Sequence, residues 1–170
     1  MKIVQNLKIQ FLRVCILVLF SGVLFVQSHA DVAEKKLQSI GRTALVSLPD
    51  FNLKDIKAKV DTGAKTSAIY CSDIVLSHNA KFVEFYLFDK EHSQYSGKKF
   101  TLAVERIAKV RSSNGEVENR VFVLINIRYA GKQHTSEFSL SNRISMKYPI
   151  LLGRSFLRNN YVVDVSKKGK

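Results

Sequence analysis

The chain has 170 residues, of which 27 are Lys or Arg and 14 are Asp or Glu, so its formal net charge is +13. This length is enough for one hydrophobic core. Apart from a basic C-terminal tail, the charges are spread from Lys35 onward without a dense block interleaved with aromatic residues. The composition therefore argues against a nucleic-acid partner and predicts at most weak association with anionic surfaces.

Residues 1–30 have the three parts of a secretory signal peptide. Basic residues come first, an apolar run covers 14–26, and Ser28-His29-Ala30 offers small residues at the cleavage positions. The apolar run is shorter than the roughly 20 residues that span a bilayer. We expect cleavage after Ala30 and a periplasmic or secreted mature protein, with an uncleaved signal anchor as the alternative.

Cleavage at this position removes Cys15 and leaves Cys71 as the one cysteine of the mature chain. An internal disulfide is then impossible, so the mature fold should be indifferent to reductant. Residues 31–39 are polar and are predicted to form a mobile lead-in. The folded domain is predicted to cover residues 40–170.

The rest of the chain reads as an all-β protein. Short runs rich in Val, Ile, Phe, Tyr and Leu are separated by polar or glycine-containing breaks about every ten residues. The predicted strands are 43–48, 56–60, 67–74, 82–88, 100–110, 117–129 and 161–165. Ser112-Ser113-Asn114-Gly115 predicts a projecting hairpin between two long strands. One short helix is expected at 154–159, after Gly153.

Several catalytic patterns are missing from the sequence. The three histidines after residue 30 are not paired at the spacing of zinc ligands. Gly63-Ala64-Lys65-Thr66 lacks the glycines of a phosphate-binding loop, and no Gly-x-Ser-x-Gly elbow is present. The sequence thus predicts neither a metal nor a cofactor.

Asp61-Thr62-Gly63 is the motif that remains. An apolar segment leads into Asp61 and is followed by Gly63. About ninety residues later, Pro149-Ile150-Leu151-Leu152-Gly153 is a second apolar run that ends in glycine. This arrangement resembles the retroviral-type aspartic proteases. The blocks AKVDTGAKTSAIY, VRSSNGEVENRVFV and SLSNRISMKYPILLGRSFLRNNYVVDV resemble more particularly a bacterial retropepsin-like aspartic protease family that is also labelled ATP-dependent zinc proteases.

The resemblance implies a small closed barrel of the acid-protease type with a flap hairpin. Peptide hydrolysis of this kind needs one carboxylate that takes a proton from water and one carboxylic acid that protonates the carbonyl oxygen. One chain supplies one Asp-Thr-Gly, so the resemblance implies a homodimer in which Asp61 of each copy forms the dyad. An acidic to mildly acidic optimum is expected for a peptide or protein substrate.

The resemblance also assigns roles to neighbouring residues. The Thr62 hydroxyls of the two chains would lock the two loops together, and Gly63 would allow close backbone approach. The implied substrate-binding residues are Ala64, the flap residues Asn114 and Gly115, and the wall formed by Ile150, Leu151, Leu152 and Gly153. Lys65 and Ser155 depart from the viral pattern.

Two other functions stay open at this point. One is a non-catalytic module that binds peptides or an envelope polymer with the same fold. The other is a metal-dependent hydrolase with ligands drawn from Asp61, Cys71 and the histidines. Dimerisation tests the first alternative, and a metal assay tests the second.

Overall fold

The computed structural model of the chain describes residues 37–111, 115, 117–144 and 146–169. Strands make up most of this part, which confirms the predicted all-β class. Helical structure is restricted to the 3-10 turn η1 (Pro49–Phe51) and the short helix α2 (Arg154–Leu157). The strands are β1 (Gln38–Ile40), β2 (Thr43–Leu48), β3 (Leu53–Val60), β4 (Ser67–Leu76), β5 (Phe82–Leu87), β6 (Lys99–Ala103), β7 (Arg106–Arg111), β8 (Val117–Tyr129), β9 (Lys132–Ser141), β10 (Ile150–Leu152) and β11 (Tyr161–Val163).

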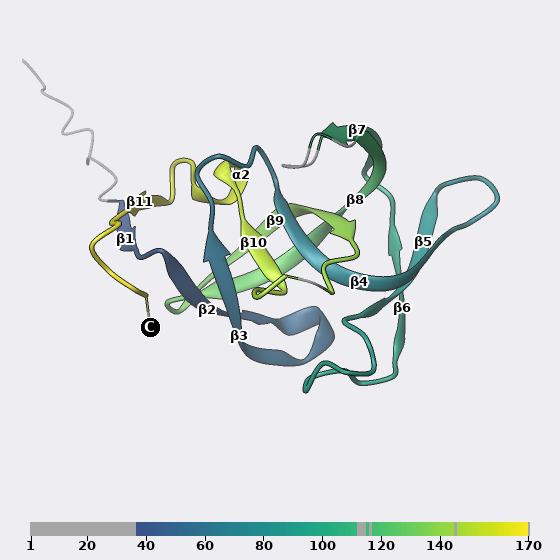
Figure 1. Cartoon of the computed structure of the whole chain (residues 1–170), viewed down its shortest axis with the longest axis horizontal. Coiled ribbons are helices and arrows are strands. Elements are labelled where there is room, and N and C mark those ends of the chain that lie inside the picture. Colours follow the sequence, from purple (N-terminus) through teal and green to yellow (C-terminus); the bar gives the residue numbers. More distant parts are fainter. Residues whose placement is uncertain (1–36, 112–114, 116, 145, 170) are drawn as a thin grey trace, which may run out of the picture. The chain divides into compact units, whose positions relative to one another are not determined.

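Six strands close into a barrel in the order β10-β3-β2-β8-β9-β4, and β4 pairs again with β10 (Figure 1). The short strand β10 runs parallel to β3 and antiparallel to β4. It therefore closes the barrel between the two strands that flank Asp61-Thr62-Gly63. The position of the motif next to the apolar run ending at Gly153 is fixed by this closure.

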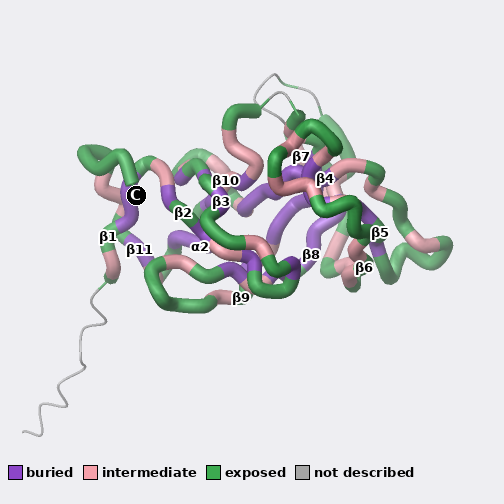
Figure 2. Tube along the Cα trace, turned by 90° about the horizontal axis from the view of Figure 1, so that it is seen from below, coloured by how far each residue is buried: buried purple, intermediate pink, exposed green. Residues whose placement is uncertain are grey.

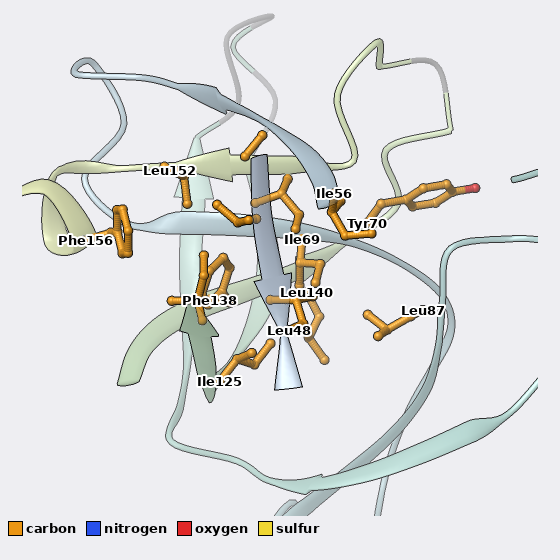
Figure 3. Packing of buried hydrophobic residues seen from close by; sticks show 14 of the residues in the cluster. Leu48, Ile56, Ile69, Tyr70, Leu87, Ile125, Phe138, Leu140, Leu152 and Phe156 are labelled. Carbon is orange, nitrogen blue, oxygen red and sulfur yellow. The ribbon is translucent and has the colours of Figure 1, made fainter. Parts of the chain in front are cut away.

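The core fills the inside of the barrel (Figures 2 and 3). Along β2 and β3 every second residue is buried, as a half-buried sheet requires, and the inward residues include Val46, Leu48, Ile56 and Ala58. Large side chains from distant segments complete the cluster, with Phe85, Phe138 and Phe156 almost fully buried. Burying such side chains is the main favourable contribution to folding, at about 2 kcal/mol each.

One predicted strand is in fact two. The expected run 100–110 breaks at Val104-Glu105, because β6 pairs with β5 whereas β7 pairs with β8. At the break the Val104 amide donates to the carbonyl of Lys81 and the Glu105 amide donates to that of Phe122. Apolar periodicity runs through this point, so the sequence pattern gave no sign that the chain changes partners.

Strand β9 was not predicted. Its sequence KQHTSEFSLS is polar apart from Phe138 and Leu140, and it forms a strand because it pairs with β8 over eight residue positions. The Ala130-Gly131 turn that joins the two strands has positive φ at both residues, +48° and +80°. This backbone twist suits a two-residue hairpin, but Ala-Gly is a weaker signal than Asn-Gly.

The ends of the domain also differ from expectation. Gln38 and Ser39, in the segment predicted as a mobile lead-in, belong to β1 and pair with β11. Residues 1–30 and 31–36 lie outside the described residues. Cys71 is buried, and its burial raises the pKa of the thiol well above the usual value.

The predicted hairpin and helix are present. β7 and β8 pair antiparallel from Arg106 opposite Phe122 to Arg111 opposite Val117. The turn residues 112–114 and 116 lie outside the described part of the chain. α2 begins at Arg154, as expected, and ends at Leu157. No helix among the described residues has the length and apolar character to cross a membrane.

Candidate active site

Asp61 directly follows β3 at the point where two parallel strands end together. Val60 is in register with Leu152 of β10, and the Asp61 amide donates to the Leu152 carbonyl at 2.9 Å. The backbone of Asp61 is thus held by the strand that closes the barrel. Its side chain is 29% exposed.

The Asp-Thr-Gly loop is held from inside by hydrogen bonds. The Gly63 amide donates to Asp61 Oδ1 at 3.0 Å, which forms the turn typical of aspartate followed by glycine. From α2, Arg154 Nη1 donates to the carbonyl oxygens of Thr62 at 3.0 Å and Gly63 at 2.8 Å. The amide of Arg154 donates to the Ala64 carbonyl. The guanidinium and the backbone of one residue therefore fix both halves of the loop.

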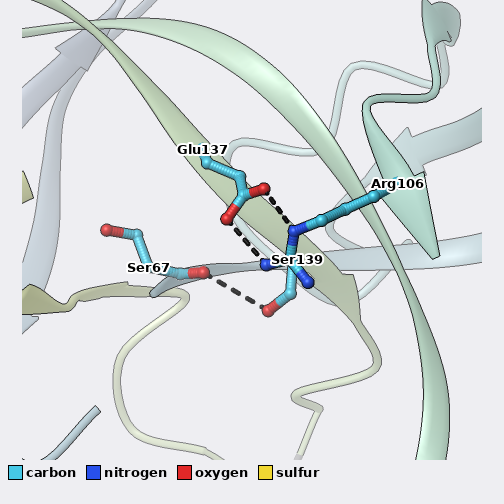
Figure 4. Close-up of polar contacts among 4 residues, drawn as sticks. All are labelled: Ser67, Arg106, Glu137 and Ser139. Carbon is cyan, nitrogen blue, oxygen red and sulfur yellow. Dashed lines mark hydrogen bonds and ion pairs between the residues drawn. The ribbon is translucent and has the colours of Figure 1, made fainter. Parts of the chain in front are cut away.

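Gly153 is packed against the same loop. A Cβ at this position would lie 2.4 Å from the carbonyl oxygen of Thr66, a distance that backbone atoms cannot accommodate. The Gly153 amide donates to Ser67 Oγ, and the Ser67 carbonyl accepts from Ser139 Oγ at 3.3 Å (Figure 4). Only glycine allows β10 to pass this close to the start of β4.

A cleft of about 660 Å³ opens next to the loop. Asp61, Gly63 and Ala64 line it on one side, and residues of the flap strands β7 and β8 line it on the other. Of the predicted wall, Leu151 lines the cleft, whereas its neighbours Ile150 and Leu152 are fully buried in the core. This alternation follows from the strand geometry of β10. Gly115 is exposed, and Asn114 lies outside the described residues.

Comparison with known proteins agrees with this geometry. The family model described as retropepsin-like aspartic endopeptidase RimB matches residues 39–169. The chain belongs to the RimB-like family. The match covers the Asp-Thr-Gly loop, the flap strands and Gly153.

Relatives of this RimB-like chain include parts of longer proteins. It is 33% identical over 130 residues to a probable alpha-L-glutamate ligase of Shewanella halifaxensis, and 28% identical over 136 residues to one of Desulfotalea psychrophila. The matches cover 75% and 79% of this chain but only 28% and 29% of those relatives. A crystal structure of a Legionella pneumophila protein of unknown function aligns with a TM-score of 0.61 at 27% identity, covering 79% of this chain and 98% of that one.

The cleft of the RimB-like chain is strongly basic. Asp61 is the one acidic residue among the described residues that line it, and six lining residues are cationic: Lys65, Arg106, Lys109, Arg111, Arg120 and Arg143. Two of these have acidic partners outside the lining. Arg106 forms a two-point ion pair with Glu137 at 2.7 and 2.8 Å (Figure 4), and Arg120 pairs with Glu118. The remaining charges face the cleft without a described ion pair.

Arg143 is a partly buried cation that has no ion pair among the described residues. Burial lowers its pKa, and the guanidinium of Arg120 lowers the pKa further, while the charge of Asp61 opposes both effects. Its Nε is buried and has no hydrogen-bond partner among the described residues. Arginine stays charged in proteins, so this is a cation partly removed from water and close to the candidate catalytic carboxylate.

Lys59 is the cation paired with Asp61, with 3.9 Å between Nζ and Asp61 Oδ2. The sequence analysis singled out Lys65, which lines the cleft but forms no ion pair with Asp61 in the described structure. Arg143 and Arg154 were not assigned roles either, since no local pattern marks a side chain that reaches a loop about ninety residues away. Among the described residues, no group of three His, Cys, Asp or Glu side chains could hold a metal ion.

Proposed function

We propose that this chain is an aspartic peptidase that acts as a homodimer with one Asp61 from each copy. The observation that carries the proposal is the position of Asp61, the one carboxylate among the described residues that line the cleft. Acid-protease chemistry needs two carboxylates, so a single chain holds half of a site. A two-fold axis next to the loop would supply the other half.

In the proposed reaction the two Asp61 carboxyl groups share one proton. The ionised one takes a proton from a water molecule, whose oxygen attacks the peptide carbonyl carbon. The protonated one gives its proton to the carbonyl oxygen. Collapse of the tetrahedral intermediate breaks the C–N bond, and the leaving nitrogen takes up a proton. Gly63 and Arg154 would keep the carboxylate in place during these steps.

Peptides rich in acidic residues are the proposed substrates. Cations on both the loop side and the flap side of the cleft would attract carboxylates and disfavour basic peptides. Relatives that are named probable alpha-L-glutamate ligases support this choice, because glutamate is an acidic amino acid. Glutamate-containing peptide bonds are therefore the first class to test.

The test is cleavage of a peptide library that contains acidic, neutral and basic sequences by the mature protein. We expect products from acidic peptides, and none with Asp61→Asn, which keeps the size of the side chain but cannot share the proton. Equal cleavage by the Asp61→Asn protein would contradict the proposed chemistry. Preference for basic peptides would contradict the proposed substrate class alone.

A second candidate function is a non-catalytic module that binds acidic peptides. It is favoured by the bonds from Gly63 and Lys59 to Asp61, since they give both carboxylate oxygens a partner within one chain. Sedimentation separates the two functions. A chain that binds acidic peptides but stays monomeric and produces no cleavage would be a binding module.

We also propose that the protein acts outside the cytoplasm. The support is the signal-peptide pattern of residues 1–30. N-terminal sequencing of the exported protein should begin at Asp31. Retention of Met1 on membrane-bound protein would indicate an anchor in place of a cleaved signal.

A further inference from the structure

A second basic hollow lies next to the cleft. It is a groove of about 540 Å³ lined by Arg42, Thr43, Lys57, Lys59, Tyr148, Lys168 and Gly169. Four of these residues are cationic and none is acidic. The groove is therefore a concentration of positive charge even on a chain with a net charge of +13.

The charges of the groove are held in place by the fold. Lys57 and Lys59 are outward-facing residues of β3, while their neighbours Ile56, Ala58 and Val60 are buried. At the opposite edge the C-terminal segment is bonded to the start of β2: the Arg42 amide donates to the Lys167 carbonyl, and Thr43 Oγ1 donates to the Lys168 carbonyl.

Most of this charge is available to a ligand. Among the described residues no acidic side chain forms an ion pair with Arg42, Lys57 or Lys168, and all three are exposed. Two ammonium groups lie near the ring of Tyr148, with Lys57 Nζ at 6.0 Å and Lys147 Nζ at 5.8 Å from its centroid. The aromatic face holds these ammonium groups near the groove.

The groove and the cleft are connected at two places. Lys59 lines the groove, and its ammonium group lies 3.9 Å from Asp61, which lines the cleft. The segment after β9 borders both as well, because Arg143 and Met146 line the cleft and Tyr148 lines the groove. One extended ligand could therefore touch both surfaces.

We propose that this groove is an exosite for acidic polypeptides: it binds carboxylates of a chain whose scissile part lies in the Asp61 cleft. The proposal rests on the acidic substrate class proposed above. Each exposed ion pair contributes little by itself. Several carboxylates of one chain bind as a set, however, because the first contact raises the effective concentration of the next. The exosite therefore favours long acidic chains over short ones.

The test compares binding of two fluorescein-labelled glutamate homopeptides to the Asp61→Asn protein, which separates binding from turnover. Four extended residues span about 14 Å and fourteen span about 50 Å, so the longer probe can contact more of both surfaces at once. The groove variant is Lys57→Gln/Lys168→Gln. The matched control is Lys81→Gln/Lys132→Gln, which removes the same charge from exposed lysines that line neither hollow.

We expect the groove variant to bind the long probe about fivefold more weakly, while the control and the short probe change less than about twofold. The difference should shrink at high salt, because screening acts on exposed charges. Equal losses in the groove and control variants would overturn the exosite and leave net charge as the cause. A changed dimer dissociation constant with unchanged probe binding would also overturn it.

Other outcomes separate the exosite from the proposed function. Length-dependent binding through the groove without any peptide cleavage by the wild-type protein would support the exosite and contradict the peptidase. Failure of both probes to bind any variant would contradict the acidic substrate class and the exosite together. The groove variant is also tested on vesicles of anionic phosphatidylglycerol. If it loses binding to the vesicles but binds the probes as before, the groove binds a lipid surface and the exosite is overturned.

Discussion

At the scale of single residues, Gly153 sets the strictest steric requirement of the site. We predict that Gly153→Ala lowers the free energy of unfolding by about 2 to 3 kcal/mol, because its Cβ would lie 2.4 Å from the Thr66 carbonyl oxygen. Gly131→Ala is the control. It has open space and only the strain of a positive φ, at about 1 kcal/mol. Urea unfolding measures both variants. If Gly153→Ala and Gly131→Ala lose the same free energy of unfolding, the backbone near Thr66 moves aside at no cost and the prediction is wrong.

Arg143 is predicted to select acidic peptides. Arg143→Met should raise KM for acidic peptides about tenfold, because it removes a partly desolvated cation from the cleft, and should change KM for neutral peptides little. Arg143→Lys should raise the KM for acidic peptides less than Arg143→Met does, because lysine keeps the charge. Steady-state kinetics on paired peptides measures this selectivity. A uniform fall in kcat for both peptides would indicate a structural role instead.

Tyr161 gives a prediction about alkaline stability. Burial raises the pKa of Tyr161 to about 12, with a smaller contribution from Tyr129. Because the unfolded tyrosine titrates near 10, the native state holds this proton more tightly, so the contribution to stability is complete below about pH 10 and is lost as pH rises toward 12. Urea unfolding between these values should show a shallower decline for Tyr161→Phe. An unchanged decline would assign the effect to other groups.

At the scale of elements, α2 acts on the loop through Arg154. We predict that Arg154→Gln lowers kcat about tenfold while the protein stays folded, since the carbonyl oxygens of Thr62 and Gly63 lose their shared donor. Arg158→Gln, at an exposed position that follows the same helix, should have little effect. Circular dichroism checks the fold of both variants. Equal kcat in the two variants would contradict the positioning role.

The elements also show what the sequence could predict. β2, β8 and the flap pairing were foreseen because the strands are runs rich in β-forming apolar residues and Asn-Gly marks the turn. β9 was missed because its residues are polar and its strand conformation comes from pairing with β8. The break between β6 and β7 was missed for the same reason, since a change of partner is a tertiary event. Asp61 could be found from its motif, whereas Arg143 and Arg154 reach the site only through barrel closure.

At the scale of the whole molecule, one barrel brings together the candidate catalytic carboxylate of Asp61, a basic cleft and a basic groove. Each depends on the same closure: β10 holds the loop after β3, and the segment between β9 and β10 borders both hollows. The family match covers residues 39–169, which include all of these parts. The proposed dyad needs a second carboxylate, and no other described residue that lines the cleft supplies one.

Mixing of wild-type and Asp61→Asn chains tests most directly the claim that two copies of the chain share one dyad. If two chains share one dyad, a mixed dimer lacks the second carboxylate, so a threefold excess of the variant should leave about one quarter of the wild-type activity by random pairing. Peptide cleavage is measured at constant wild-type concentration. In a second series Lys132→Gln chains, which keep Asp61, are added instead, and activity should then rise in proportion to the added chains. Activity that stays unchanged as Asp61→Asn chains are added would contradict a dyad shared between two copies.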